Sequence, residues 1–509
     1  MSLPSRRRRA LAAGALAVVL AGCSAGSGTS EPSSGDPAEA APSTLAVGLA
    51  AEPASLDFTT TDGAAIPEAL LYNVYETLVK LDSESGEVVP LLAEDYEVSD
   101  DGLTYTFTLH EDVTFSNGDE FTADDVKYSI ERVQSEAWTV SLKEAMSIVG
   151  SVEVSSPTEV VVNLSEPSND WLYRMTTRIG AMFSETGVDD LANTPVGTGP
   201  YVLDTFTRGD SLTLATRDDY WGEAPDVEEV TLRYFEDATA MNNALLSGGI
   251  DVIGTLQSPE SLERFADDDR FEVLEGTTNG ELVLSMNNAR PPFDDVRVRQ
   301  AVRHALDRQA ILDTTYAGYG ELIGSMVPPT DPWYEDLTDV APYDPAQAQA
   351  LLAEAGVSDL NVAFRIPNLP YAVTASQVVK SQLAEVGINA EIEVLEFPAR
   401  WLDVVFQQND YDMSLIAHVE PRDMTIFADP DYYFGYVDPE FQSTLEQAGT
   451  ADSEQYVELM RQAARQLSED AAADWLFVLP NLIVAEQDVQ GLPVNRVSES
   501  FDLTGVTRA

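Results

Sequence analysis

Few side chains in this sequence of 509 residues could ligate a metal or act as a nucleophile. The chain contains one cysteine, Cys23, and three histidines, His110, His304 and His418. One cysteine permits neither a disulfide within the chain nor a cysteine-based metal cluster. Three histidines far apart in sequence argue against a multi-histidine metal site. We therefore expect no cofactor and no resident metal, and we interpret His110 and His304 as structural or surface residues.

Carboxylates, in contrast, are abundant. The chain has 87 Asp and Glu residues against 28 Lys and Arg, and its formal net charge is −59. Paired carboxylates can cleave glycosidic bonds, so an exported hydrolase is one interpretation. Close acid pairs are expected by chance in so acidic a chain, however. The charge also makes nucleic acids and anionic lipid head groups poor partners, and it is typical of a solvated acidic surface.

Common catalytic signatures are absent from the body of the sequence. It has no GxxxxGK[ST] or HExxH pattern, its one GxSxG match falls on residues 22–26 around the single cysteine, and no GxGxxG pattern is followed by a helix. These patterns accompany phosphate binding, zinc proteolysis, acyl transfer and dinucleotide binding respectively. No repeat with a period of about 20 to 50 residues is present either, which excludes solenoids and propellers. The sequence therefore favours a binding protein over an enzyme.

The first residues have the order of an export signal. Arg6 to Arg9 form a basic segment, and a short apolar stretch follows up to Gly22. A bilayer-spanning helix needs about 20 apolar residues, so residues 1–22 are interpreted as a signal peptide. The tetrapeptide Leu-Ala-Gly-Cys that ends at Cys23 resembles the bacterial lipobox, which implies lipidation of Cys23. The stretch 23–43 is rich in Ser, Gly, Ala and Pro and predicts a flexible tether. Export by the general or the twin-arginine route stays open.

Strand and helix patterns alternate through the rest of the chain. Apolar alternation predicts strands at 44–49, 104–110 and 390–395. Helix signals begin at a capping box of Thr122 and Asp125, at Asp294 and Asp295, at Asp344-Pro345 and at 376–386. This alternation predicts an α/β fold. Residues 44–509 are too many for one core at about 150 residues a domain, so two or three lobes are expected.

A series of sequence blocks carries a family resemblance. The blocks lie at 75–79 (YETLV), 90–94 (PLLAE), 101–109, 115–118, 122–126, 197–201 (GTGPY), 220–222 (YWG), 245–252, 287–288 and 294–307. In this order, the chain from about residue 44 to 509 resembles family 5 of the bacterial extracellular solute-binding proteins, which includes dipeptide-, oligopeptide- and nickel-complex-binding members. Independently of the family, Gly197 and Gly199 suit a tight turn with positive φ, and Gly248-Gly249 suits a helix end.

The resemblance implies an architecture and a function. It implies two α/β lobes joined by a hinge, with the ligand enclosed between them. Lobe one would comprise 44–279 and 480–509, with an extra subdomain near 76–197, and lobe two would comprise 280–479. The protein would be a monomeric lipoprotein on the outer face of the cytoplasmic membrane. There it would capture a small peptide-like or amino-acid-derived ligand, metal chelators included, for an ABC permease and ATPase complex.

Two positions in the first lobe align with ligand-contacting regions of the peptide- and nickel-complex-binding branches. Trp138 would offer an aromatic wall, although ordinary core packing explains it equally well. Arg178 follows a helix expected at 171–177 and would bind a ligand carboxylate with its two-pronged guanidinium group. A surface ion pair is the alternative for Arg178.

The second lobe supplies the other aligned positions. Arg422 and Asp423 stand side by side and suit a zwitterionic ligand, although the local pattern departs from that of the peptide-binding relatives. His418 could add a hydrogen bond or a metal contact, or be an ordinary buried polar residue. Tyr433, flanked by Tyr432 and Tyr436, could close over the ligand or pack the lobe.

Other interpretations stay open at this stage. A peptide-sensing receptor could use the same scaffold without transport, and an exported carboxylate-dependent hydrolase is a further alternative. Neither the ligand nor the choice between import and sensing follows from the sequence, because the family implied by the resemblance binds peptides, metal chelates, opines and sugars.

Overall fold

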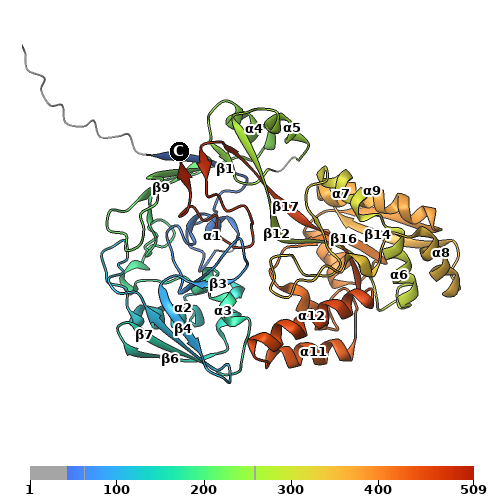
Figure 1. Ribbon diagram of the computed structural model, residues 1–509, viewed down its shortest axis with the longest axis horizontal. Helices are drawn as coiled ribbons and strands as arrows, with labels where there is room; N and C mark the ends of the chain where they lie inside the picture. The colour runs from blue at the N-terminus through green and yellow to red at the C-terminus, as the bar shows by residue number, and fades with distance from the viewer. Residues whose placement is uncertain (1–42, 62, 257–258) are drawn as a thin grey trace, which may run out of the picture. The chain divides into compact units, whose positions relative to one another are not determined.

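The computed structural model describes residues 43–61, 63–256 and 259–509. The predicted signal peptide, Cys23 and nearly all of the tether lie outside these residues. Eleven strands of the described part form one mixed sheet, in the order β15-β14-β16-β12-β17-β11-β1-β10-β9-β8, with β13 paired to β17 (Figure 1). The fold is α/β, as expected. No helix in the described ranges is long and apolar enough to cross a membrane.

One end of the sheet belongs to the first lobe. Its strands are β1 (Thr44–Leu49), β8 (Tyr201–Thr207), β9 (Ser211–Thr216), β10 (Glu229–Tyr234) and β11 (Val252–Ile253), and its helices are α1 (Ala65–Leu70), α4 (Ala238–Leu246) and α5 (Glu263–Ala266). The central strand β1 pairs in parallel with both β10 and β11. It lies where the sequence predicts a strand, because Leu45, Val47 and Leu49 are buried in the core of this lobe.

A second, smaller sheet follows β1 in the chain. It is antiparallel, in the order β4 (Ala93–Val98), β5 (Thr104–Leu109), β7 (Glu159–Leu164) and β6 (Val149–Ser156). Helix α2 (Ala123–Gln134) packs on β6 and β7. The predicted capping box is confirmed, since the Thr122 N–H donates to Asp125 Oδ2 at 2.9 Å. The hairpin β2 (Val79–Leu81) and β3 (Val88–Pro90) and the short helix α3 (Trp171–Arg174) complete this region.

The other end of the sheet belongs to the second lobe. Its strands are β13 (Glu321–Leu322), β14 (Leu360–Pro367), β15 (Ile388–Leu395) and β16 (Met413–His418), and its helices are α6 (Val296–Ala305), α7 (Arg308–Tyr316), α8 (Pro345–Glu354), α9 (Pro370–Glu385), α10 (Ala399–Trp401), α11 (Pro439–Gly449) and α12 (Ser453–Glu469). Asp295 and Asp344 cap α6 and α8 through side-chain hydrogen bonds, as predicted. Helix α9 begins at Pro370, six residues before the predicted start, because proline is well suited to the first turn.

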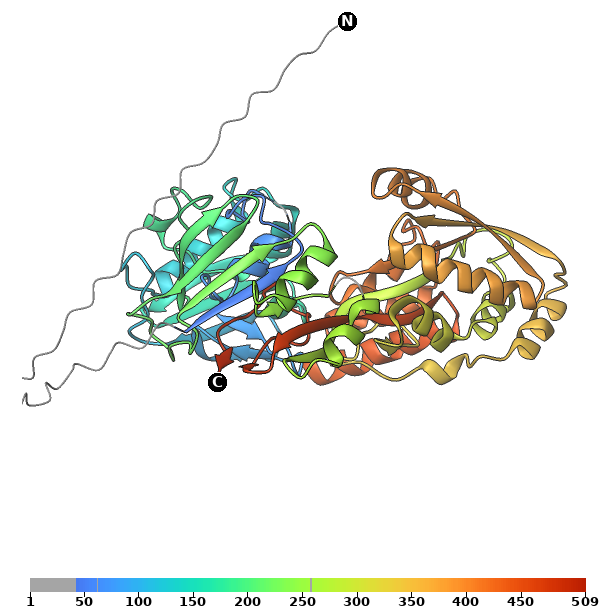
Figure 2. The same cartoon turned by 90° about the horizontal axis from the view of Figure 1, so that it is seen from above.

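Two long strands connect the two ends of the sheet. β12 (Phe271–Met286) pairs in antiparallel fashion with β17 (Ala473–Glu486), and they run side by side in both views (Figure 1, Figure 2). β17 pairs with β11 at its first-lobe end, and β12 pairs with β16 at its second-lobe end. Their register is irregular between Thr277 and Glu281. The predicted lobe boundaries, at 279/280 and 479/480, fall in this irregular segment, and they stay a prediction.

Two local predictions are wrong. Gly197 and Gly199 do not have positive φ angles. Their lack of a side chain instead permits close backbone packing, since a Cβ on Gly197 would lie 2.0 Å from the carbonyl oxygen of Val74. The helix expected at 171–177 ends at Arg174, and a 3-10 turn (Arg178–Gly180) follows it. At Gly248 the prediction is confirmed, because its φ of 71° ends α4.

Candidate functional site

Four of the six predicted ligand contacts lie in one region of the second lobe. His418 is the last residue of β16, Arg422 and Asp423 follow in the next loop, and Tyr433 stacks on the imidazole of His418 with ring centroids 6.0 Å apart. Trp138 and Arg178 lie in the first lobe, where Trp138 packs against aromatic rings and Arg178 pairs with Glu499. The sequence therefore predicts a cluster in the second lobe and two separate positions in the first.

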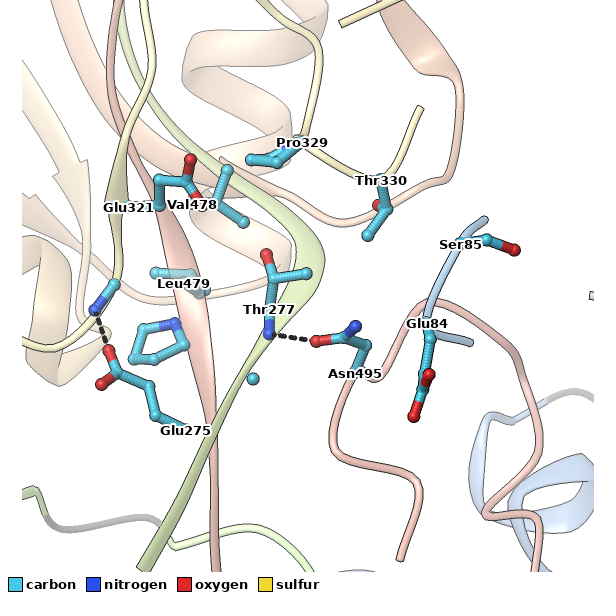
Figure 3. Close-up of a pocket in the computed structure, with 13 residues that line it drawn as sticks. Glu84, Ser85, Glu275, Thr277, Glu321, Pro329, Thr330, Val478, Leu479 and Asn495 are labelled. Atoms are coloured by element: carbon cyan, nitrogen blue, oxygen red, sulfur yellow. Dashed lines mark hydrogen bonds between the residues drawn. The ribbon is translucent and has the colours of Figure 1, made fainter. Parts of the chain in front are cut away.

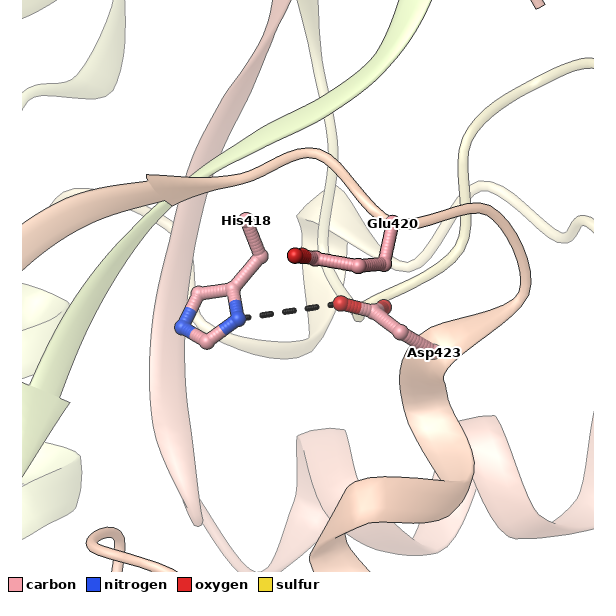
Figure 4. Close-up of side chains that lie close together, drawn as sticks. All are labelled: His418, Glu420 and Asp423. Carbon is pink, nitrogen blue, oxygen red and sulfur yellow. Dashed lines mark ion pairs between the residues drawn. The ribbon is translucent and has the colours of Figure 1, made fainter. Parts of the chain in front are cut away.

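A chain of hydrogen bonds orients the His418 ring. Nε2 lies 2.9 Å from the Tyr433 hydroxyl, which lies 3.1 Å from Ser285 Oγ on β12. Burial lowers the pKa of His418 to about 4, so the imidazole is neutral at physiological pH. The other ring nitrogen, Nδ1, lies 3.6 Å from Asp423 Oδ2 (Figure 4). His418 thus has one nitrogen fixed by a tyrosine and one facing a carboxylate.

Two buried carboxylates lie beside this ring. Glu281 is directly opposite His418 in the β12–β16 pairing, which places both side chains on the same face of the sheet. Glu281 is 1% exposed and Asp423 is 8% exposed. Among the described residues, neither Glu281 Oε2 nor either carboxylate oxygen of Asp423 has a hydrogen-bond partner. Burial raises the pKa of both groups, and negative neighbours raise it further, Asp423 for Glu281 and Glu420 for Asp423.

Arg422 connects the loop after β16 to the first lobe. Its guanidinium carbon lies 3.7 Å from the ring centroid of Tyr173 in α3 and 5.2 Å from that of Trp333. Arg422 Nε is 3.9 Å from Asp331 Oδ1. Burial raises the pKa of Asp331 to about 7, and the charge of Arg422 opposes this rise. The guanidinium therefore lies between two aromatic rings of different lobes.

A nearby asparagine strengthens the same contact between the lobes. Asn169 Nδ2 donates to the carbonyl oxygens of Ala448 and Ala451, at 3.2 and 3.0 Å. Ala448 lies in the last turn of α11, and Ala451 lies in the connection from α11 to α12 in the second lobe. The loop after β16 therefore contacts the first lobe through Arg422, at a boundary between the lobes where small ligands often bind.

The two predicted contacts in the first lobe are occupied with partners of their own. Trp138 is fully buried and packs against Phe58 and Phe183, with ring centroids 6.1 and 6.4 Å apart. Arg178 Nε donates to Glu499 Oε1 at 2.8 Å, and the Arg178 backbone N–H donates to Glu499 Oε2 at 2.8 Å. Trp138 thus has a packing role and Arg178 an ion-pair role in this structure. Their ligand contacts stay a prediction.

A separate cavity of about 520 Å³ lies beside the irregular middle segment of the paired strands β12 and β17 (Figure 3). Its wall comes from both lobes and comprises Glu84, Ser85, Glu275, Gly276, Thr277, Gly320, Glu321, Pro329, Thr330, Val478, Leu479, Pro480 and Asn495. The Thr277 N–H donates to Asn495 Oδ1 across it at 3.0 Å. None of the six predicted residues lines this cavity. We consider the His418 region the better candidate, because it has the buried polar groups without partners.

Sequence reasoning missed Glu281. A signal was present, because this acid directly precedes the apolar run Leu282-Val283-Leu284 in a strand with a buried interior. A charged residue at such a position is seldom fully buried unless it is paired. Its proximity to His418 depends on strand pairing between distant segments, which the local pattern does not reveal.

Comparison with known proteins identifies the family. The family model described as "Bacterial extracellular solute-binding proteins, family 5 Middle" matches residues 87–442. The chain belongs to this family. Its members include the substrate-binding proteins of ABC importers, they act outside the cytoplasm, and they work with ABC permeases.

Relatives of the family 5 chain support this assignment. It is 30% identical, over 366 residues, to the glutathione-binding protein GsiB of Salmonella paratyphi A, and the match covers 68% of this chain and 70% of that protein. HbpA2 from Haemophilus parasuis has the same fold, with a TM-score of 0.83, 24% identity and coverage of 92% of this chain and 100% of that one. The dipeptide-binding protein of Pseudoalteromonas sp. SM9913, solved with Met-Leu, has a TM-score of 0.72, 23% identity and coverage of 92% and 100%.

Proposed function

We propose that this family 5 protein captures a short peptide or an amino-acid-derived compound between its lobes and delivers it to an ABC permease without altering it chemically. The ligand's polar end contacts His418, Asp423 and Tyr433. The observation that carries this proposal is a pair of buried carboxylates, Glu281 on β12 and Asp423 in the loop after β16, beside a neutral imidazole. Among the described residues, Glu281 Oε2 and both carboxylate oxygens of Asp423 have no hydrogen-bond partner. Buried polar groups are normally paired, so unpaired ones are available to a ligand.

The relatives support this ligand class. A protein 30% identical to this chain is named for glutathione, a peptide-like compound, and one solved structure of the same fold holds the dipeptide Met-Leu. Closure of the lobes would place the residues of the first lobe against the same ligand. The irregular segment of β12 near Thr277 and Glu281 is where we propose that the lobes bend, with lobe two comprising 280–479.

Calorimetry tests the ligand site. We expect the purified protein to bind glutathione or Met-Leu, and we expect Asp423→Asn to weaken that binding by at least about a hundredfold, because loss of one buried charged partner costs about 3 to 5 kcal/mol. Asp431→Asn changes an exposed acid in a nearby loop and is the matched control. Equal affinities for the wild type and Asp423→Asn would exclude this site. Recovery of a cleaved ligand by mass spectrometry would exclude binding without conversion.

We also propose that the protein is a monomer held at the outer face of the cytoplasmic membrane by lipid on Cys23. The basic, apolar and Leu-Ala-Gly-Cys segments in succession support this anchor, and two acyl chains give stable attachment where one is marginal. Cys23→Ala should release the protein from the membrane fraction. Retention of the variant in that fraction, at the wild-type level, would contradict lipid anchoring.

A further inference from the structure

Three potential metal ligands converge at the end of β16. One ligand atom each from His418, Glu420 and Asp423 lies within 4.8 Å of the others (Figure 4). The 3.6 Å between His418 Nδ1 and Asp423 Oδ2 is longer than an ordinary hydrogen bond of about 2.7 to 3.2 Å. It is close to the separation of about 3.4 Å between two ligand atoms of a tetrahedral ion with bonds of about 2.1 Å. Glu420 is exposed and can rotate toward the other two.

Glu281 is a second, independent sign of a cation at this place. Its side chain is 1% exposed, lies on the same face as His418, and has Asp423 as its strongest charged neighbour. Among the ion pairs of the described residues, neither Glu281 nor Asp423 has a Lys or Arg partner. Two buried carboxylates side by side are stable only when they are protonated or when a counter-charge lies beside them, and a bound cation would supply that charge.

The histidine is also held as a metal ligand would be. A ligating imidazole usually makes a hydrogen bond through its second nitrogen, which fixes the ring and its tautomer. Here Nε2 is 2.9 Å from Tyr433 Oη, which is in turn 3.1 Å from Ser285 Oγ. With its proton on Nε2, His418 donates to Tyr433 and keeps the lone pair of Nδ1 for an ion.

We propose that His418 Nδ1 and the carboxylates of Glu420 and Asp423 bind a divalent transition-metal ion, with Glu281 adding negative charge behind it. One imidazole and two carboxylates suit Zn²⁺, Co²⁺ or Mn²⁺, whereas Mg²⁺ and Ca²⁺ prefer ligand sets made of oxygen alone. Because the loop contacts the first lobe, the remaining coordination position is open to a carboxylate or amine of the transported compound. This last step rests on the proposed function, while metal binding itself does not.

Titration of tag-free, chelator-treated protein with Zn²⁺ and Co²⁺, without peptide, tests the site. We expect one ion per chain and a Co²⁺ absorption band typical of nitrogen and oxygen ligands. Asp423→Asn should weaken Zn²⁺ binding by at least about a hundredfold and Tyr433→Phe by about tenfold. Glu440→Gln, which changes an exposed acid on α11, should bind as the wild type does. Absence of Zn²⁺ binding below about 1 mM, or equal affinities in all four proteins, would overturn the proposal.

Two further measurements separate loss of metal binding from misfolding, and metal binding from peptide binding. Glu420→Gln changes an exposed side chain and keeps an oxygen that can accept from the Val419 N–H, and it should still weaken Zn²⁺ binding by at least about tenfold. An unchanged affinity in this variant would remove Glu420 from the site and contradict the proposed ligand set. Peptide binding measured in excess chelator separates the two proposals. Peptide binding without any Zn²⁺ binding defeats only the metal site, and Zn²⁺ binding without peptide binding defeats only the proposed ligand class.

Discussion

The second lobe buries two groups of charged residues that differ in how their charge is balanced. In the first group, Asp474 on β17 lies between Arg303 of α6 and Arg308 of α7, with Oδ1 3.2 Å from Arg303 Nε and 3.0 Å from Arg308 Nε. In the second, Glu281 and Asp423 lie together with a neutral histidine and no Lys or Arg ion-pair partner among the described residues. Both groups are almost inaccessible to solvent.

This difference separates structural charges from charges that are available to a ligand. Arg303 also donates to the carbonyl oxygen of Gly324, and Arg308 to that of Ala341, so the first group ties two helices and a loop to a central strand. The second group makes no comparable ties, because Glu281 Oε2 and both carboxylate oxygens of Asp423 have no hydrogen-bond partner in the described part of the chain. Burial of a carboxylate therefore indicates a binding site here only where its counter-charge is missing.

Removing the charge of Asp474, which lies between Arg303 and Arg308, should have the largest effect on stability. Asp474→Asn removes the one negative charge between two buried arginines, and we expect it to lower the free energy of unfolding by about 3 to 5 kcal/mol. Urea denaturation measures this loss. Glu469→Gln, at the exposed end of α12, is the control and should change stability by no more than about 0.5 kcal/mol. A loss below about 1 kcal/mol for Asp474→Asn would show that the pairing contributes little.

Asp331 is a buried carboxyl whose charge is only partly balanced, and this makes its effect on stability depend on pH. Its cationic partner Arg422 is 3.9 Å away and does not cancel the rise in pKa that burial causes. The pKa of Asp331 in the folded protein is about 7, above the ordinary aspartate value of 3.8. The unfolded chain therefore releases this proton first, and the contribution of Asp331 to stability falls as the pH rises from about 4 to 7 and then levels off.

Asp331→Asn removes the titrating carboxyl, so the variant should not lose unfolding free energy at this position as the pH rises. Relative to the wild type, the variant should gain about 2 to 3 kcal/mol in unfolding free energy between pH 5 and pH 8. Urea denaturation of both proteins at the two pH values gives the difference. An equal wild-type-to-variant difference at pH 5 and pH 8 would mean that the carboxyl keeps its ordinary pKa in the folded protein.

Removing one carboxyl from the pair of Glu281 and Asp423 should raise stability, whereas Asp474→Asn lowers it. Glu281→Gln replaces a buried carboxyl by a neutral amide of the same shape. In excess chelator at pH 8 we expect the free energy of unfolding to rise by about 1 to 2 kcal/mol, because an uncompensated charge is removed. Differential scanning calorimetry would detect the higher melting temperature. A destabilised variant would show that Glu281 has a stabilising partner, and the two groups would then not differ as argued.

Local features of the fold could be predicted from the sequence, and non-local ones could not. The strand at β5 and the capping box of Thr122 and Asp125 depend on side chains a few residues apart, so the sequence pattern contains them. Arg178 pairs with Glu499, 321 residues away, and no local pattern indicates that partner. The glycines at 197 and 199 were assigned the wrong cause, because close backbone packing and positive φ both select for glycine.

The candidate site shows the same limit. His418 and Asp423 were selected because they align with ligand-contacting regions of the family, and their contact with a ligand stays a prediction. The feature that gives it chemical character, Glu281 opposite His418, depends on the register between β12 and β16. The position of Arg422 between two rings was also not predictable, since Tyr173 and Trp333 come from different lobes.

The smallest expected effect concerns that Arg422 contact, which balances a charge with aromatic rings instead of a carboxylate. A cation over an aromatic face contributes about 0.5 to 2 kcal/mol, more when it is shielded from water as Arg422 is. A double-mutant cycle with Tyr173→Leu and Arg422→Gln should therefore give a coupling energy of about 1 kcal/mol in urea denaturation, because leucine keeps the apolar volume but not the ring. The same cycle with Phe206 and Arg208, a partly exposed pair within the first lobe at 4.3 Å, is the control for the energy of a cation over a ring without a contact between lobes. Since Tyr173 and Arg422 belong to different lobes, their coupling also reports on closure. Coupling indistinguishable from zero, with normal coupling in the control pair, would mean that the lobes separate here in solution without ligand. The contact between Tyr173 and Arg422 would then belong to the closed state alone.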